Sequence, residues 1–396
     1  MEIVKVDSVF TTRRFDPLAF VKRPIVYETV LSALEIPGTQ LVISGPIGSG
    51  KTTLLNTCAR QLGIQFVTVN CEPYHTMDLI VENVITQLGV SIKEHEEHSQ
   101  NESFIEKVGL GWLGAQNVTG SHSKQVFRTT NPTQPSFHWL AHQLVQRNKM
   151  LVIDDFHKLE AEVQMDLFGK IKVYLNISNE YPAGQSRIVL MGAAKTSGHP
   201  LFANPDLRNR ITSVELELMT DSEIESIITL GEGLLNIQIP DASKKQIIQL
   251  SCGVPSICHI LCLNLCKMAG IKETQLNRVT VNGDSLKKAI EFHRTVSLHS
   301  FKEMYELATV RKRVRKYDNA KIILNAIASL DLNQVTQDQI LAAIRSRVPE
   351  YPLSNLTLYL RELTEETRGA VLRMDPNTRK YSFVDPFFKS FIRSQQ

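Results

Sequence analysis

The stretch GPIGSGKT, at residues 45–52, constrains the fold of this chain more than any other feature. It fits the pattern G-x-x-x-x-G-K-[ST], and its fixed positions are Gly45, Gly50, Lys51 and Thr52. The apolar, β-prone run TQLVISG leads into it, and TTLLNTCARQLG follows it with the composition of a helix. A strand, a glycine-rich loop and a helix, in this order, form a cradle for phosphate groups. The sequence therefore predicts a site for a nucleoside triphosphate.

The residues of this loop are expected to hold ATP and Mg²⁺ in different ways. Glycines allow tight turns that point backbone N–H groups at phosphate oxygens, and the following helix adds the positive end of its dipole. We expect Lys51 to reach the β- and γ-phosphates and the Thr52 hydroxyl to bind Mg²⁺. The expected nucleotide-binding residues are Gly45, Pro46, Ile47, Gly48, Ser49, Gly50, Lys51, Thr52 and Thr53.

A second motif, KMLVIDDFHKL at residues 149–159, supplies the acidic groups that such a loop requires. Its apolar run predicts a buried strand, which ends at two adjacent carboxylates. We expect Asp154 to hold Mg²⁺ through the water shell of the ion, and Asp155 to polarise the water that attacks the nucleotide. Together the two motifs predict hydrolysis of ATP.

The order of elements along the chain predicts an α/β fold with a parallel sheet. Strands are expected at residues 41–44, 65–70, 150–154, 187–192 and 211–218, and helices at residues 51–62, 76–88 and 161–178. Strands that alternate with helices form parallel sheets with helices on their faces. The polar and glycine-rich residues 90–136 do not fit this alternation and are expected to be an insertion.

These motifs, with RIVLMGAA, NPDLRNRI, LMTDSEIESII and SCGVPSICHIL, resemble those of AAA+ ATPases over roughly residues 15–270. More narrowly, the chain is similar to origin-recognition initiator ATPases, transposon target-selection ATPases and the STAND signalling ATPases, several of which carry the G-x-P motif formed here by Gly253 and Pro255. The resemblance implies a P-loop NTPase (AAA+) core at residues 1–218, an α-helical lid at 219–300, and a linker with a winged-helix domain at 301–396.

The resemblance also implies that a second subunit completes the ATP site. NPDLRNRI matches the segment that supplies an arginine to the γ-phosphate of the neighbouring subunit, with Arg210 as the first candidate and Arg208 as the second. A guanidinium placed there neutralises charge in the transition state. The expected partner is therefore a second copy of the chain in an ATP-bridged homo-oligomer.

Three departures from the family pattern predict slow hydrolysis. Asp155 stands where the family usually has glutamate, so its carboxylate is one methylene farther from the water. The strand at 187–192 ends in MGAA without a polar sensor, for which Lys195 or Thr196 could substitute. Ser256 stands where an arginine often follows the G-x-P motif.

The C-terminal end of the chain has an excess of basic residues, and its sequence pattern is compatible with two functions. Residues 301–396 hold 16 Lys and Arg against 11 Asp and Glu, and their pattern of three helices, a hairpin and a closing helix resembles a winged helix. Such a domain places its third helix in the major groove of DNA. Glu362, Glu365 and Glu366 on the third helix would repel phosphate, so packing against protein is the alternative. The expected DNA contacts are Arg311, Lys312, Arg313, Arg315, Lys316, Arg361, Arg373, Arg379 and Lys380.

The sequence thus predicts an ATP-hydrolysing switch that forms oligomers on double-stranded DNA. The alternative is a STAND-type signalling or defence ATPase that recruits a protein effector. The protein partners expected besides a second copy of the chain are an effector or a recombinase. No apolar run has the length of a membrane span and the N-terminus lacks the pattern of a signal peptide, so a cytoplasmic location is expected. Cys258, Cys262 and Cys266 share one helix face and are interpreted as buried apolar residues rather than metal ligands.

Overall fold

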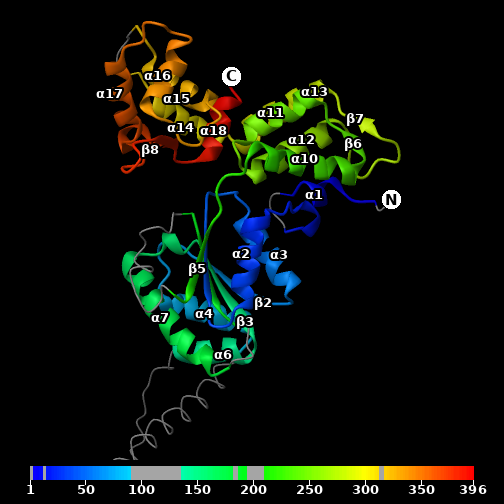
Figure 1. Ribbon diagram of the computed structural model, residues 1–396, viewed down its shortest axis with the longest axis vertical. Helices are drawn as coiled ribbons and strands as arrows, with labels where there is room; N and C mark the ends of the chain where they lie inside the picture. Colours follow the sequence, from blue (N-terminus) through cyan, green and yellow to red (C-terminus); the bar gives the residue numbers. More distant parts are fainter. Residues whose placement is uncertain (1–2, 12–14, 91–134, 182–185, 194–208, 312–315) are drawn as a thin grey trace, which may run out of the picture. The chain divides into compact units, whose positions relative to one another are not determined.

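The computed structural model describes residues 3–11, 15–90, 135–181, 186–193, 209–311 and 316–396. The chain divides into two compact units (Figure 1). We call them the sheet unit (Ile25–Ser44 and Cys58–Glu215) and the helical unit (Met1–Pro24, Gly45–Thr57 and Leu216–Gln396). Most of the expected insertion at residues 90–136, and both Lys195 and Thr196, lie outside the described residues.

The described part of the sheet unit contains one five-stranded parallel sheet in the order β2-β3-β4-β1-β5. Its strands are β1 (Gln40–Ser44), β2 (Gln65–Asn70), β3 (Lys149–Asp154), β4 (Ile188–Gly192) and β5 (Ile211–Glu215). Strands β1 and β4 are buried along their whole length, as expected when helices cover both faces of a parallel sheet. Because all strands run in one direction, Ser44, Asp154 and Gly192 lie at the same carboxyl edge.

The prediction of a strand at 211–218 was wrong in its extent, because the strand ends at Glu215. Among the described strands, β5 stands at the edge of the sheet and pairs only with β1. Ser44 is the last residue of β1 and is paired with Glu215. The alternating pattern continues beyond this point, but the partner strand does not.

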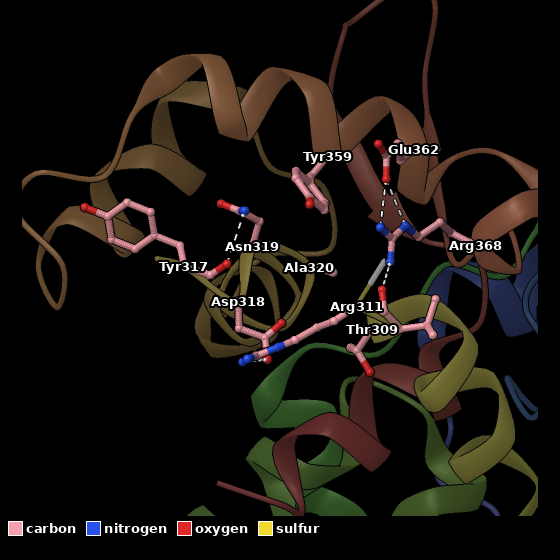
Figure 2. A pocket seen from close by; sticks show the side chains of 10 residues that line it. Thr309, Arg311, Tyr317, Asp318, Asn319, Ala320, Tyr359, Glu362 and Arg368 are labelled. Carbon is pink, nitrogen blue, oxygen red and sulfur yellow. Dashed lines mark hydrogen bonds and ion pairs between the residues drawn. The ribbon is translucent and has the colours of Figure 1, made fainter. Parts of the chain in front are cut away.

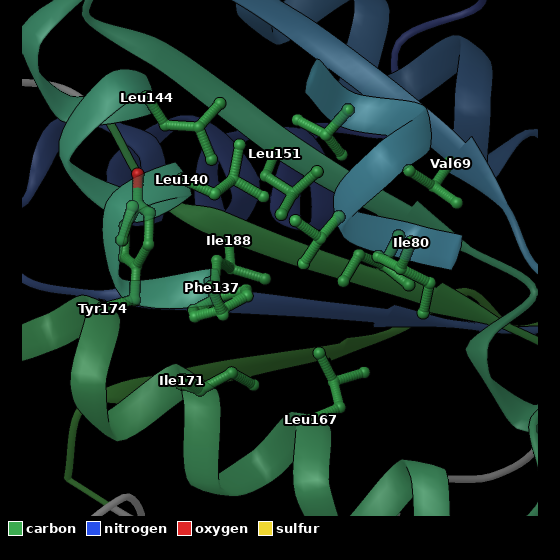
Figure 3. Packing of buried hydrophobic residues seen from close by; sticks show 14 of the residues in the cluster. Val69, Ile80, Phe137, Leu140, Leu144, Leu151, Leu167, Ile171, Tyr174 and Ile188 are labelled. Carbon is green, nitrogen blue, oxygen red and sulfur yellow. The ribbon is translucent and has the colours of Figure 1, made fainter. Parts of the chain in front are cut away.

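Three helices that pack against the sheet form the main core of the sheet unit (Figure 3). They are α4 (Met77–Leu88), α6 (Phe137–Gln146) and α7 (Ala161–Asn179). Two further helices, α2 (Pro24–Glu35) and α3 (Lys51–Gln61), come directly before and after β1 in the sequence. In Figure 3, Leu140 and Leu144 of α6 lie near Tyr174 of α7 and Leu151 of β3. Each buried side chain of this size contributes about 1.5–3 kcal/mol to folding.

In the helical unit, residues 219–300, where an α-helical lid is expected, form α10 (Asp221–Leu235), α11 (Asp241–Ser251), α12 (Pro255–Met268) and α13 (Gly283–Phe292). A capping box formed by Thr220 and Glu223 opens α10. The sequence did not predict the short parallel pair β6 (Ile237–Gln238) and β7 (Val279–Thr280), since two residues are too few for a periodic pattern.

Residues near the N-terminus pack into the core of the lid helices. Val6 and Val9, in α1 (Val6–Val9), and Phe10 belong to the same buried cluster as α10, α11 and α12. A one-turn helix, η1 (Pro17–Ala19), follows. The interpretation of the cysteines is confirmed, because Cys258, Cys262 and Cys266 are buried in this cluster and free.

The expected three helices, hairpin and closing helix are all present in the C-terminal domain, by which we mean α14 to α18. The π-helical turn η3 (His293–Ser297) precedes α14 (Ser300–Thr309), α15 (Asn319–Ser329), α16 (Gln337–Arg345), α17 (Leu353–Leu363), η4 (Glu366–Arg368), the antiparallel pair β8 (Leu372–Met374) and β9 (Tyr381–Phe383), and α18 (Pro386–Arg393). A capping box formed by Thr336 and Gln339 opens α16. Within the described ranges, no helix is long and apolar enough to cross a membrane.

Candidate nucleotide-binding site

The phosphate loop begins at the residue after Ser44, the last residue of β1, and leads into α3 at Lys51. Gly45 has a φ of 152°, and a Cβ at this position would lie 2.5 Å from the carbonyl oxygen of Leu216. Gly48 has a φ of 76°, in the left-handed region where residues with a Cβ are strained. The glycines are therefore required by the backbone path, and the N-terminus of α3 points into the loop.

Lys51 already lies across the loop that it is expected to serve. Its Nζ atom donates hydrogen bonds to the carbonyl oxygens of Gly45, at 2.8 Å, and Pro46, at 2.9 Å. The ammonium group is thereby held where phosphate oxygens of a bound nucleotide would compete with these carbonyls. Among the described residues, the buried Oγ atom of Ser49 has no hydrogen-bond partner. A buried hydroxyl without a partner is costly, so the loop fits an oxygen-rich ligand such as the phosphates of ATP.

Gly48 is the point where the lid and the C-terminal domain meet the phosphate loop. A Cβ at Gly48 would overlap Ser256 Oγ and would lie 3.0 Å from Val254 and 3.1 Å from the ring of Phe387. Val254 and Ser256 lie at the start of α12, and Phe387 lies in the first turn of α18. The G-x-P motif explains the first contact: Gly253, with a φ of 74°, turns the chain, and Pro255 starts α12. A serine hydroxyl thus meets the loop from the G-x-P motif, where the family pattern has an arginine.

The two carboxylates of the acidic motif lie at the carboxyl end of β3. Asp154 Oδ1 accepts a hydrogen bond from the backbone N–H of Asp155 at 2.8 Å, which orients that carboxylate. Asp155 adopts the left-handed conformation, with φ 55° and ψ 30°, which is uncommon for residues other than glycine. Its Oδ2 atom lies 2.7 Å from Nζ of Lys158, and this hydrogen bond raises the pKa of Lys158. The adjacent oxygens suit Mg²⁺, which prefers carboxylate and water ligands.

Sequence reasoning missed the residue that shares this acidic environment. Cys71 directly follows β2, and its backbone N–H donates to the carbonyl oxygen of Asp154 at 2.9 Å. Burial, followed by the negative charges of Asp154 and Asp155, raises the pKa of the Cys71 thiol to about 12. The parallel register explains the position of Cys71. Asn70 is paired with Asp154, so the next residue, Cys71, lies beside the two carboxylates.

Arg210 lies at the opposite edge of the sheet from Asp154. It is exposed and immediately precedes β5, and its carbonyl oxygen accepts a hydrogen bond from the first residue of β1, Gln40, at 2.8 Å. All five strands are parallel, so Arg210 is at the amino edge and Asp154 at the carboxyl edge. A strand of this length spans about 16 Å. Within one copy the two side chains are therefore far apart. Arg208 lies outside the described residues.

The basic residues expected to contact DNA differ in how far acids already engage them. Arg311 pairs with Asp318 at 2.6 Å, and Lys316 lies 4.0 Å from Glu350. Arg373 donates to Ser382 Oγ at 3.0 Å. The exposed candidates include Arg361 on α17, and Arg379 and Lys380 at the turn between β8 and β9. Lys312, Arg313 and Arg315 lie outside the described residues.

The expectation that three acids share the third helix was wrong, because α17 ends at Leu363. Glu362 is the one acid of the three on this helix, and its carboxylate accepts hydrogen bonds from Arg368. Glu365 lies 3.7 Å from Arg361. These ion pairs reduce the expected repulsion of phosphate. Asn355, also on α17, donates to Asn319 Oδ1 at 3.1 Å and is half-buried.

Arg368 also closes one side of a pocket of about 270 Å³ in the C-terminal domain (Figure 2). Its guanidinium, 3% exposed, donates to Glu362 and to the carbonyl oxygens of Ala308 and Val310. Figure 2 shows Arg311 beside Asp318 in the same pocket. Since both arginines are bound to carboxylates within the domain, this pocket carries little free positive charge for an anionic ligand.

The chain is similar to one known protein family and to several solved structures. Residues 38–197 match the family model described as AAA domain. The Walker-type ATPase paby2304 of Pyrococcus abyssi is similar in structure over 97% of this chain and 99% of its own, with a TM-score of 0.55 and 14% identity. Cdc6p from Pyrobaculum aerophilum aligns over 100% of both chains, with a TM-score of 0.46 and 14% identity. The Aeropyrum pernix ORC2 protein aligns over 98% of this chain and 97% of its own, with a TM-score of 0.46 and 15% identity.

The predicted fold class is confirmed: the chain has a parallel-sheet α/β core with the AAA fold of P-loop ATPases. The predicted enzyme class, an ATPase, is confirmed with it, because residues 38–197 match the AAA domain model.

Proposed function

We propose that this AAA-type ATPase is a slow, ATP-dependent switch that assembles into homo-oligomers with ATP at the subunit interface. The phosphate loop holds the phosphates, and Thr52 and Asp154 hold Mg²⁺. Asp155 polarises a water molecule, which attacks the γ-phosphorus as the bond to the leaving oxygen of ADP breaks. Arg210 of the adjoining copy stabilises the charge of the transition state.

The observation that carries this proposal is the position of Arg210 at the amino edge of the sheet. A side chain about 16 Å from the acidic edge of its own sheet acts on ATP only when another copy supplies it. Slow turnover is supported by the short side chain of Asp155, by its ion pair with Lys158, and by the serine at position 256.

The test is complementation between two inactive variants. Lys51→Ala removes the ammonium group that holds the phosphates, and Arg210→Ala removes the guanidinium that acts on the neighbouring ATP. Each variant alone is therefore expected to lose hydrolysis. An equimolar mixture forms interfaces that combine an intact cradle from one variant with an intact arginine from the other, so about a quarter of the wild-type rate returns. Lys287→Ala, at a side chain that is 82% exposed, is the matched control. Wild-type hydrolysis by Arg210→Ala, or a mixture that stays inactive, would contradict the proposal.

We further propose that the C-terminal domain is a winged helix that contacts double-stranded DNA through Arg361, Arg379 and Lys380. A salt titration of duplex binding measures the number of phosphate contacts, because the slope of log K against log salt is about −0.9 per contact. The double change Arg379→Ser and Lys380→Ser is expected to reduce the slope by about 2. A wild-type protein that binds no duplex at low salt would refute DNA contact and favour the alternative.

The alternative is a STAND-type switch, and the contact between Phe387 and Gly48 favours it. In such a switch the C-terminal domain rests on the nucleotide loop, and exchange of ADP for ATP frees it to recruit a protein effector. Phe387→Ala is then expected to speed the release of a fluorescent ADP analogue several-fold. An unchanged release rate would remove the support for this alternative.

A further inference from the structure

The turn after β3 is tied to the end of the neighbouring strand by a histidine. Asp155 is followed by the short turn η2 (Phe156–Lys158). From this turn the imidazole of His157 extends to the end of β4, where its Nδ1 atom accepts a hydrogen bond from the backbone N–H of Ala193 at 3.3 Å. β3 and β4 are paired, with Ile153 opposite Leu190. The hydrogen bond therefore joins the carboxyl ends of two adjacent strands, beside the two acidic residues.

The last residue of β4 has no side chain, and this allows the approach. A Cβ on Gly192 would lie 3.0 Å from the Phe156 ring and 3.1 Å from His157 Nδ1. Both distances are tighter than side chains normally accept, so the turn would have to move. The strand end that lacks a polar residue in the sequence is thus occupied by a polar group from the adjacent turn.

We infer that His157 is the positioning residue for ATP hydrolysis, holding Asp155 in place from the end of β4. This inference rests on the proposed role of Asp155 as the residue that polarises water. The left-handed conformation of Asp155 costs about 1–3 kcal/mol, so the turn keeps it only while surrounding contacts impose it. Because Nδ1 accepts a hydrogen bond, the neutral ring carries its proton on Nε2. The hydrogen bond to Ala193 fixes the ring, and the ring fixes the turn.

Three substitutions at His157 separate this role from general packing. The amide oxygen of asparagine occupies the place of Nδ1, whereas glutamine is one methylene longer and does not. We expect His157→Ala and His157→Gln to lower kcat about tenfold or more, as displacement of a catalytic group does. KM and the dissociation constant for ATP are expected to stay within twofold. His157→Asn is expected to keep kcat within about threefold of wild type.

Gly192→Ala tests the same contact with His157 intact. Its Cβ is expected to displace Phe156 and His157 and to lower kcat while ATP binding stays unchanged. The matched control is Gly169→Ala on α7, where an added Cβ meets nothing within 4 Å. An asparagine variant as slow as the alanine variant, losses confined to KM, or full activity of Gly192→Ala would each overturn the inference. A wild-type protein that binds ATP but never hydrolyses it would overturn the proposed function as well, and this outcome is distinct because no variant is then needed.

Discussion

The pKa of the Cys71 thiol reflects its burial and the negative charge at the carboxyl edge of the sheet. The side chain is 1% exposed and lies near the carboxylates of Asp154 and Asp155. Burial and these negative charges disfavour the thiolate, which explains why the pKa rises to about 12. The same negative charge favours a divalent cation at this edge, so the inert thiol and the proposed Mg²⁺ site have a common cause.

This environment makes a prediction about chemical modification. All six cysteines of the chain are free and buried. Alkylation requires the thiolate, and a raised pKa keeps Cys71 protonated at every pH below about 12. We expect iodoacetamide at pH 8 to modify none of the six in the native protein and all six in urea, as read from the intact mass. Rapid modification of Cys71 in the native protein would show that the edge is open.

At the residue scale, the sequence predicted what depends on local order. The phosphate loop and the acidic pair could be located because each follows a strand directly, and the pattern of the chain defines strands. His157 stood in the motif that was read, but its hydrogen bond to Ala193 depends on the adjacency of β3 and β4. Strand order in a parallel sheet is set by tertiary packing, so the chain between the strands does not reveal it. The contact of Phe387 with Gly48 is hidden for the same reason.

At the element scale, periodicity located the helices well and the short strands poorly. α4 and α7 begin and end within a few residues of the predicted bounds, since both combine apolar spacing with clear ends. β5 stops where β1 stops, and β6 and β7 exist only because two loops lie side by side. Pairing partners, which are not local, decide the limits of such strands.

Two glycines of α10, Gly231 and Gly233, provide a matched pair of substitutions to alanine. A Cβ on Gly231 would overlap the ring of Phe10, which is 0% exposed, whereas a Cβ on Gly233 meets nothing within 4 Å. Alanine favours a helix over glycine, so Gly233→Ala is expected to stabilise the protein by about 0.5–1 kcal/mol. Gly231→Ala is expected to destabilise it by about 1–3 kcal/mol, because the Phe10 ring has to leave its place. Urea unfolding measures both changes. Equal stabilisation by the two variants would mean that the N-terminal residues do not pack on α10.

At the scale of the whole molecule, one cation joins the lid helices to the C-terminal domain within the helical unit. Arg393, at the end of α18, donates to the carbonyl oxygens of Ala328 and Leu330 in the C-terminal domain and to that of Gln249 on α11. Its side chain is 10% exposed. Carbonyl groups near the end of a helix lack partners within that helix and attract positive charge. The guanidinium of Arg393 therefore donates hydrogen bonds to carbonyl groups of both the lid helices and the C-terminal domain.

This sharing predicts that the lid helices and the C-terminal domain open together. Arg393→Met removes the hydrogen bonds to these part-buried carbonyl groups, so we expect a loss of about 1–3 kcal/mol in the free energy of unfolding. Hydrogen exchange should accelerate together in α11 and in α15 and α18, because one opening event exposes all three. Lys287→Met, at an exposed cation of α13, is the matched control and should change stability by less than about 0.5 kcal/mol. If exchange rises in α15 and α18 while α11 keeps its protection, Arg393 stabilises the C-terminal domain alone, and movement of the lid would not reach that domain through this residue.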